Sequence, residues 1–146
     1  MHRLTSNKQV KDMRLVELLH NDVFIKKDKD GKNIAWYRDY DREIDSRELI
    51  KELFKCNNIN PGEEFFTDDE FFDEYMLDAL QDGLNTLEGI IAVLYQQLWS
   101  KCDLRETLKT YEDLDMTPEQ IREKIAEAER IIVDRSWEQY PEEMGR

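Results

Sequence analysis

Carboxylates are the residues of this sequence whose types and spacing best suit chemistry. Residues 56–100 contain ten acidic residues and no lysine or arginine. Eight of the ten fall close together: Glu63, Glu64, Asp68, Asp69, Glu70, Asp73, Glu74 and Asp78. Residues four apart on a helix are separated by about 6 Å along its axis, so these acids would form like-charge pairs on a helix face. Such a face could occupy the basic groove of a nucleic-acid-binding protein in place of phosphates.

Two other interpretations of this acidic segment stay open. Acids are favoured near a helix N-terminus by the helix dipole, so the segment can be a solvated helix face without further role. The helical spacing of Glu70, Asp73, Glu74 and Asp78 also suits carboxylates that share Mg²⁺, as in all-α nucleotide hydrolases. A site of that kind needs a second acidic pair on a facing helix, and residues 86–101 contain only Glu88. We therefore expect no metal ion, no cofactor and no catalytic residue.

Aromatic and arginine residues form an alternative ligand-binding site. Its members are Trp36, Tyr37, Arg38, Tyr40 and Arg42. Aromatic rings interleaved with arginines can stack on nucleotides, although on a β-hairpin such residues more often pack across strands. This group supports the alternative function, which is binding of a nucleotide or another small ligand.

Thiol chemistry has less support. Cys56 and Cys102 are too few for a disulfide framework or a cysteine-rich zinc site. Neither cysteine has a histidine nearby in sequence, so we interpret both as structural thiols. His20 falls at the end of a predicted helix, where the helix dipole favours a cation.

The charge distribution restricts the class of partner. The net charge is −13 in total, with +2 in residues 1–55, −10 in residues 56–100 and −5 in residues 101–146. A protein of this sign does not bind nucleic acid by neutralising phosphates, and anionic membranes repel it. We expect a basic protein partner, no direct contact with nucleic acid and no membrane association. A homodimer stays open.

The order of expected helices and strands along the chain predicts an α+β fold. We expect a mostly helical bundle with one small β-hairpin near the N-terminus. The hairpin joins residues 23–25 to residues 34–37 through an Asp30-Gly31 turn, and Glu43-Ile44 is a third extended piece. Apolar spacing predicts a helix over 8–20, another after Asp45, and further helices over 68–81 and 86–101. The helix over 86–101 has one acid and is expected at the centre of the core.

Capping patterns predict where helices start and end. Asp45 is an expected N-cap, and Thr67-Asp68-Asp69-Glu70 matches the capping box Thr-x-x-Glu. Gly83 is an expected C-cap. Asp103 and Glu106 predict a separate short helix that ends near Tyr111. The strongest helix start is Thr117-Pro118-Glu119-Gln120, with a capping hydroxyl, a first-turn proline and a glutamine three residues on.

We expect a single domain over residues 1–146, with a helix–hairpin–helix part (1–55) and an acidic helical part (63–135). No apolar run approaches the roughly 18 residues of a membrane span, and the N-terminus lacks the apolar core of a signal peptide. These features predict a cytoplasmic protein.

Residues 104–121 read LRETLKTYEDLDMTPEQI. This segment resembles the "L..KL..YEDTGLTPEEI" of short accessory proteins from prophages and mobile elements of Gram-positive bacteria. Asp115 stands where glycine is usual, so it must take a turn conformation that glycine adopts more readily. Residues 12–54, with the pieces 37–40 and 45–49, are also similar to uncharacterised proteins of that origin. The resemblance implies an accessory protein acting in the bacterial host cell, and it assigns no activity to any residue.

The charge and the resemblance together predict a small acidic phage or mobile-element protein. It would bind and inhibit a nucleic-acid-binding host protein, such as a nuclease of a defence system, in the manner of an anti-CRISPR nucleic-acid mimic. The first alternative is nucleotide or small-ligand sequestration, and the second is Mg-dependent hydrolysis of a nucleotide.

Overall fold

The computed structural model describes residues 3–139, and the side chains of residues 3–134. Residue contacts divide the chain into two compact units, of which the larger is Leu4–Lys109 and the smaller is formed by residues from Thr110 onward with Arg3. The boundary falls inside a helix. The expectation of a single domain stays a prediction.

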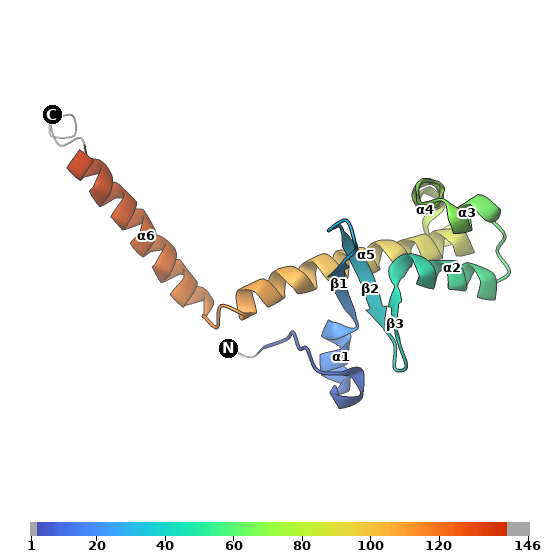
Figure 1. Cartoon of the computed structure of the whole chain (residues 1–146), viewed down its shortest axis with the longest axis horizontal. Coiled ribbons are helices and arrows are strands. Elements are labelled where there is room, and N and C mark those ends of the chain that lie inside the picture. Colours follow the sequence, from blue (N-terminus) through green and yellow to red (C-terminus); the bar gives the residue numbers. More distant parts are fainter. Residues whose placement is uncertain (1–2, 140–146) are drawn as a thin grey trace. The chain divides into compact units, whose positions relative to one another are not determined.

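The larger unit contains a small sheet and most of the helices (Figure 1). Its elements are η1 (Val10–Asp12), α1 (Leu15–Asn21), β1 (Val23–Lys27), β2 (Asn33–Arg38), β3 (Glu43–Asp45), α2 (Ser46–Cys56), α3 (Glu63–Thr67), α4 (Asp69–Asp82), η2 (Gly83–Asn85) and most of α5 (Leu87–Glu112). The smaller unit contains the end of α5 and α6 (Pro118–Gln139). The predicted α+β class, mostly helical with a hairpin near the N-terminus, is confirmed.

The sheet has three antiparallel strands in the order β1-β2-β3. Phe24 lies opposite Trp36, and Tyr37 lies opposite Ile44. The β1–β2 turn is held by the Asp28 carboxylate, which accepts hydrogen bonds from the amides of Asp30 and Lys32, each at 2.9 Å. Gly31 in this turn has a φ of +77°, which a side chain would disfavour. The predicted hairpin and the third extended piece are therefore confirmed.

Two apolar clusters form the core of the larger unit. In the first, Phe65 of α3 stacks 4.5 Å from Phe54 of α2 and 4.8 Å from Phe72 of α4, measured between ring centroids. It also contains Ile50, Met76, Ala79, Ile91 and Ala92. The second cluster packs one face of the sheet on α5 through Val23, Ala35, Leu98 and Cys102. Figure 1 shows α2, α3 and α4 grouped around one end of α5.

The position of α5 differs from its prediction as a fully central helix. Ile91 and Leu98 are buried, but Leu87, Ile90 and Leu94 are exposed, because the core covers only one side of the helix. The helix also continues to Glu112, and the separate helix predicted from Asp103 is wrong. No glycine or proline interrupts residues 90–112, and the buried stripe passes from Leu98 to Cys102 and Arg105 at unbroken helical spacing.

The first predicted helix begins later than expected. Arg14 is the extended N-cap of α1, and residues 10–12 form only a 3-10 turn. A continuous helix from Lys8 would place Ser6 about 20 Å from Asn21 along the axis. The Ser6 amide instead donates a hydrogen bond to the Asn21 side chain at 2.8 Å, so the chain must fold back between them.

Helix α4 begins one residue later than its predicted capping box. The Asp68 carboxylate accepts hydrogen bonds from the amides of Glu70 and Phe71, at 2.9 and 3.3 Å. Thr67 ends α3 instead, and its hydroxyl donates to the Glu63 carbonyl. The carboxylate can bond two orphan amides at once, which favours Asp68 as the cap. The predicted caps Asp45 and Gly83 are confirmed.

The start of α6 follows the sequence prediction. The Gln120 amide donates to the Thr117 hydroxyl at 3.1 Å, and the Thr117 amide donates to the Gln120 side chain at 2.8 Å, which is a reciprocal capping box. Asp115 has a φ of +51°, the turn conformation expected of it. Ile125 and Ile132 of α6 are exposed. Over the described part of the chain, no helix has the length and apolar character needed to cross a membrane.

Candidate functional site: the acidic surface of α3 and α4

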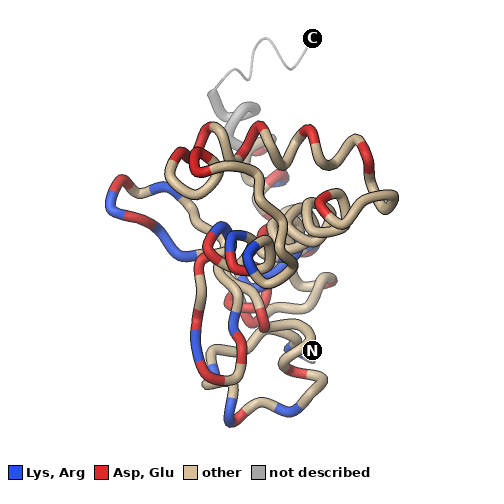
Figure 2. The backbone as a smooth tube through the Cα atoms, turned by 90° about the vertical axis from the view of Figure 1, so that its right-hand side faces the viewer, with Lys and Arg blue, Asp and Glu red and all other residues tan. Residues whose placement is uncertain are grey.

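All eight predicted acidic residues lie on α3, on α4 or on the residue between them, and all eight are exposed. Phe65, Phe72 and Met76 hold the opposite sides of these two helices in the core. Figure 2 shows acidic positions and no basic ones along α4, at the top of the view. We call these eight residues the acidic surface.

Two members of the acidic surface, Asp69 and Asp73, share one cation of the chain. Arg47 of α2 places its Nη2 atom 3.2 Å from both carboxylate oxygens of Asp73, and its Nη1 atom lies 4.0 Å from Asp69. Sequence reasoning missed this ion pair because Arg47 is more than 20 residues away in the chain. The sequence feature that could have indicated this pair is an arginine in the first turn of a helix that packs beside the acidic helix.

The remaining acids of the acidic surface form no ion pair with any residue that the structure describes. Among the described residues, no ion pair involves the side chains of Glu63, Glu64, Glu70, Glu74 or Asp78. Asp68 bonds only the backbone amides that it caps. Glu70, Glu74 and Asp78 follow one another at four-residue spacing and turn away from the buried side of α4. We call these three residues the unpaired stripe.

Several acids elsewhere in the larger unit have cationic partners. Glu52 accepts two hydrogen bonds from Arg42, and these bonds lower the pKa of its carboxyl group. Hydrogen bonds from Lys8 and then Arg14 lower the pKa of Glu17 in the same way. Asp22 pairs with Lys101. The unpaired stripe differs from these three acids because no described cation pairs with it.

The carboxylates considered for Mg²⁺ are divided between two directions. Asp73 turns to Arg47, whereas Glu70, Glu74 and Asp78 face solvent. Within the described residues, no three or more histidine, cysteine, aspartate or glutamate side chains are grouped so that they could hold a metal ion.

The sheet separates the five aromatic and arginine candidates. Trp36 and Arg38 point to one face, where the Arg38 guanidinium lies 4.3 Å from the centre of the Phe24 ring. Tyr37 points to the other face and packs against the cluster that contains Cys102. Arg38, Tyr40 and Arg42 line one cleft together. Tyr37 joins Arg38 and Tyr40 in the lining of a second cavity, of about 180 Å³, and Trp36 lines neither.

The two cysteines differ in environment. Cys102 is fully buried, its Sγ atom lies 3.5 Å from the Phe24 carbonyl, and burial raises the pKa of its thiol to about 11. Cys56 is exposed at the end of α2. His20 is exposed at the end of α1, as its sequence position predicted.

A buried polar network fixes the N-terminal segment, and sequence reasoning did not predict it. Arg105 of α5 donates from Nε to the Asn21 side chain at 3.0 Å and from Nη2 to the Ser6 carbonyl at 2.9 Å. Asn21 also donates to the carbonyls of Leu4 and Glu17. The only sequence signal is an arginine in the helical stripe that continues from Leu98 and Cys102.

Comparison of the chain with protein-family models, with curated proteins and with solved structures gave no significant match.

Proposed function

We propose that this chain is a non-enzymatic protein that binds a basic, nucleic-acid-binding protein of a bacterial host through its acidic surface, and inhibits it. The carboxylates of α3 and α4 would occupy positions that nucleic-acid phosphates otherwise fill. The expected origin in a phage or mobile element rests on the resemblance of residues 104–121, and a defence nuclease is the kind of target that such an origin favours.

The unpaired stripe is the observation that carries this proposal. Glu74 has a like charge four residues before it and another four residues after it. Each such pair costs an isolated helix a few tenths of a kcal/mol. Arg47 relieves the neighbouring row, Asp69 and Asp73, but no described cation relieves the stripe. A basic partner would supply cations to these carboxylates. The cost of the like-charge pairs in the free chain would then be offset when the partner binds.

The electrostatics also suit rapid recognition. A segment of −10 attracts a basic groove over long distances and raises the association rate, and salt screens this attraction at the Debye length of about 8 Å under physiological conditions. Arg47 contributes by holding one edge of α4 against α2, which keeps the carboxylates on a rigid helix.

The first test compares proteins retained from a bacterial lysate by two immobilised chains. One is the wild-type chain and the other carries E70Q, E74Q and D78N. At low salt, the wild type should retain a DNA-binding protein that duplex DNA displaces from it, and the triple variant should not retain that protein. A matched control carries E123Q, E127Q and E129Q, three exposed acids of α6, and has the same net charge as the triple variant.

The two variants separate a specific surface from general acidity. Retention by the α6 control and loss from the stripe variant supports binding at the acidic surface. Equal retention by the stripe variant contradicts the proposal. Equal loss from both variants also contradicts it, because net charge alone would then explain the binding.

A further inference from the structure

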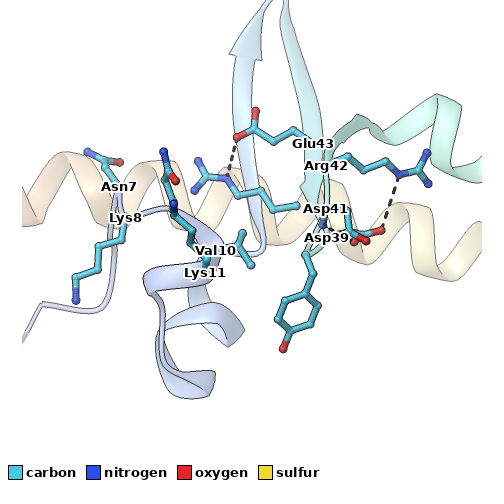
Figure 3. Close-up of a pocket in the computed structure, with 11 residues that line it drawn as sticks. Asn7, Lys8, Val10, Lys11, Asp39, Asp41, Arg42 and Glu43 are labelled. Atoms are coloured by element: carbon cyan, nitrogen blue, oxygen red, sulfur yellow. Dashed lines mark hydrogen bonds and ion pairs between the residues drawn. The ribbon is translucent and has the colours of Figure 1, made fainter.

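A cleft of about 460 Å³ lies in the larger unit, on the side of the sheet near the N-terminal segment. One wall is the segment Asn7–Lys11. The other is the β2–β3 turn, Asp39–Arg42, with Arg38 at the end of β2 and Glu43 at the start of β3. Figure 3 shows Asn7, Lys8 and Lys11 on one side of the cleft and Asp39, Arg42 and Glu43 on the other. None of its lining residues belongs to the acidic surface.

Arg38 is a largely dehydrated arginine with one buried donor that the described protein leaves without a hydrogen bond. Its side chain is 14% exposed, and its guanidinium rests on the Phe24 ring. The Nε atom is buried without a hydrogen-bond partner, and the ion pair with Glu43 is long, at 3.8 Å. Burial lowers the pKa of Arg38, although an arginine stays protonated at neutral pH. A buried donor without a partner is costly unless a bound group accepts a hydrogen bond from it.

The facing wall supplies further donors. Lys11 is exposed and takes part in no ion pair among the described residues, and Lys8 reaches Glu17 at 3.0 Å. The side-chain amides of Asn7 and Gln9 also line the cleft. The Arg105–Asn21 network anchors this wall through Ser6, so the donors stand on a fixed segment.

The acids of the cleft limit the charge of any ligand. Asp39, Asp41 and Glu43 line it together with four basic residues. Arg42 bonds Glu52 and also lies 3.8 Å from the Asp39 carboxylate, which accepts a hydrogen bond from the Asp41 amide at 3.2 Å. The cleft is therefore nearly neutral overall, and the basic residues least engaged by carboxylates are Arg38, 3.8 Å from Glu43, and the exposed Lys11. It suits a ligand with one anionic group rather than a polyanion such as nucleic acid.

We propose that this cleft binds a small molecule through a single forked oxyanion, a carboxylate or a phosphate monoester, held by Arg38 and Lys11. The planar guanidinium presents two parallel N–H groups, which match the two oxygens of such a group. Tyr40, which is 77% exposed on the cleft lining, offers a ring against which the rest of the ligand can pack. This proposal does not depend on the function proposed for the acidic surface.

The test is a titration of the ¹⁵N-labelled full chain, followed by nuclear magnetic resonance at constant ionic strength. The probes are inorganic phosphate, adenosine monophosphate, benzoate and, as an uncharged comparison, adenosine. We expect a saturable shift of the Arg38 Nε–H resonance and of the backbone amides of residues 7–11 with an oxyanion probe, and none with adenosine. A response to adenosine monophosphate but not benzoate assigns a phosphate ligand, and the reverse assigns a carboxylate.

Variants tie the response to the proposed donors. R38Q should weaken binding about tenfold or more, which is typical for loss of a hydrogen bond to a charged group, and K11Q should weaken it by a smaller factor. R14Q removes the same charge outside the cleft lining and should bind as the wild type does. If R38Q does not fold, K11Q and R14Q decide the matter. Absence of saturable shifts up to about 10 mM of every oxyanion, or equal weakening by K11Q and R14Q, overturns the proposal.

Discussion

At the residue scale, the acids of α4 differ in what lies beside each of them. Asp73 and Glu74 are neighbours in sequence but point about 100° apart on the helix. Asp73 therefore reaches Arg47, and Glu74 reaches only solvent and the like charges of Glu70 and Asp78. The angle between consecutive side chains of the helix therefore separates carboxylates that stabilise the fold from carboxylates that are free to contact a partner.

The environments of the two cysteines predict different reactivity. The Cys102 thiol, buried and with a raised pKa, should not react with iodoacetamide at pH 8 in the folded chain, whereas Cys56 should. Mass spectrometry should find one modified thiol per native chain and two after unfolding in urea. Modification of both thiols at similar rates in the native chain would contradict the buried position of Cys102.

The same raised pKa predicts a pH dependence of stability. An unfolded thiol ionises near pH 9, and the folded Cys102 thiol ionises near 11. Protons are thus released more readily from the unfolded chain between these values, so the free energy of unfolding should fall as the pH rises through this range. Urea unfolding at several pH values should show that the free energy of unfolding falls more steeply with pH for the wild type than for C102A. Equal slopes would contradict the raised pKa of Cys102.

Asn21 predicts a large effect on stability. N21A removes hydrogen bonds to Leu4, Ser6, Glu17 and Arg105 in a fully buried position, and should lower the free energy of unfolding by about 2–4 kcal/mol. Asn57 is an exposed comparison that donates only to the Leu53 carbonyl, and N57A should cost about 1 kcal/mol or less. Urea unfolding measures both losses. Equal losses of unfolding free energy for N21A and N57A would contradict a stabilising role of the buried network.

At the scale of the element, the two acidic rows of α4 affect the stability of the fold in opposite directions. The unpaired stripe destabilises the helix, and the row of Asp69 and Asp73 stabilises it through Arg47. E74Q removes two like-charge pairs and should raise the free energy of unfolding by about 0.4–1 kcal/mol. D73N removes the partner of the half-buried Arg47 and should lower it by about 1 kcal/mol. Both variants change the net charge equally, so they are matched controls for one another. Chemical denaturation in low salt measures both changes in the free energy of unfolding. Changes of the same sign for E74Q and D73N would contradict the distinction between the two rows.

Elements governed by local chemistry were predictable from the sequence. The hairpin follows from the residues around Asp30-Gly31, and the start of α6 follows from Thr117 and Gln120. Elements governed by distant contacts were not. The late start of α1 depends on Asn21 and Arg105, and the uninterrupted α5 depends on burial of Cys102 and Arg105 in one stripe. The exposure of the acids was predictable, but the Arg47 pairs required a tertiary contact.

At the scale of the whole molecule, the charge of −13 is unevenly spread, and residues 56–100 contribute most of it. A complex formed through this segment should weaken steeply with salt, and its association rate should fall more than its dissociation rate rises. Stopped-flow mixing with the retained partner at several salt concentrations measures both rates. Salt-independent association would indicate an apolar contact elsewhere and would contradict binding through the acidic surface.

The most direct test of the account is competition with nucleic acid. The partner recovered on the wild-type chain is bound to a fluorescent DNA duplex, and the anisotropy is followed as this protein is added. The account predicts that the wild type and the α6 control release the DNA near one equivalent, and that the E70Q, E74Q and D78N variant releases little. Release by all three chains, or a complex that keeps its DNA when the wild type binds, would contradict the claim that these carboxylates occupy a phosphate-binding surface.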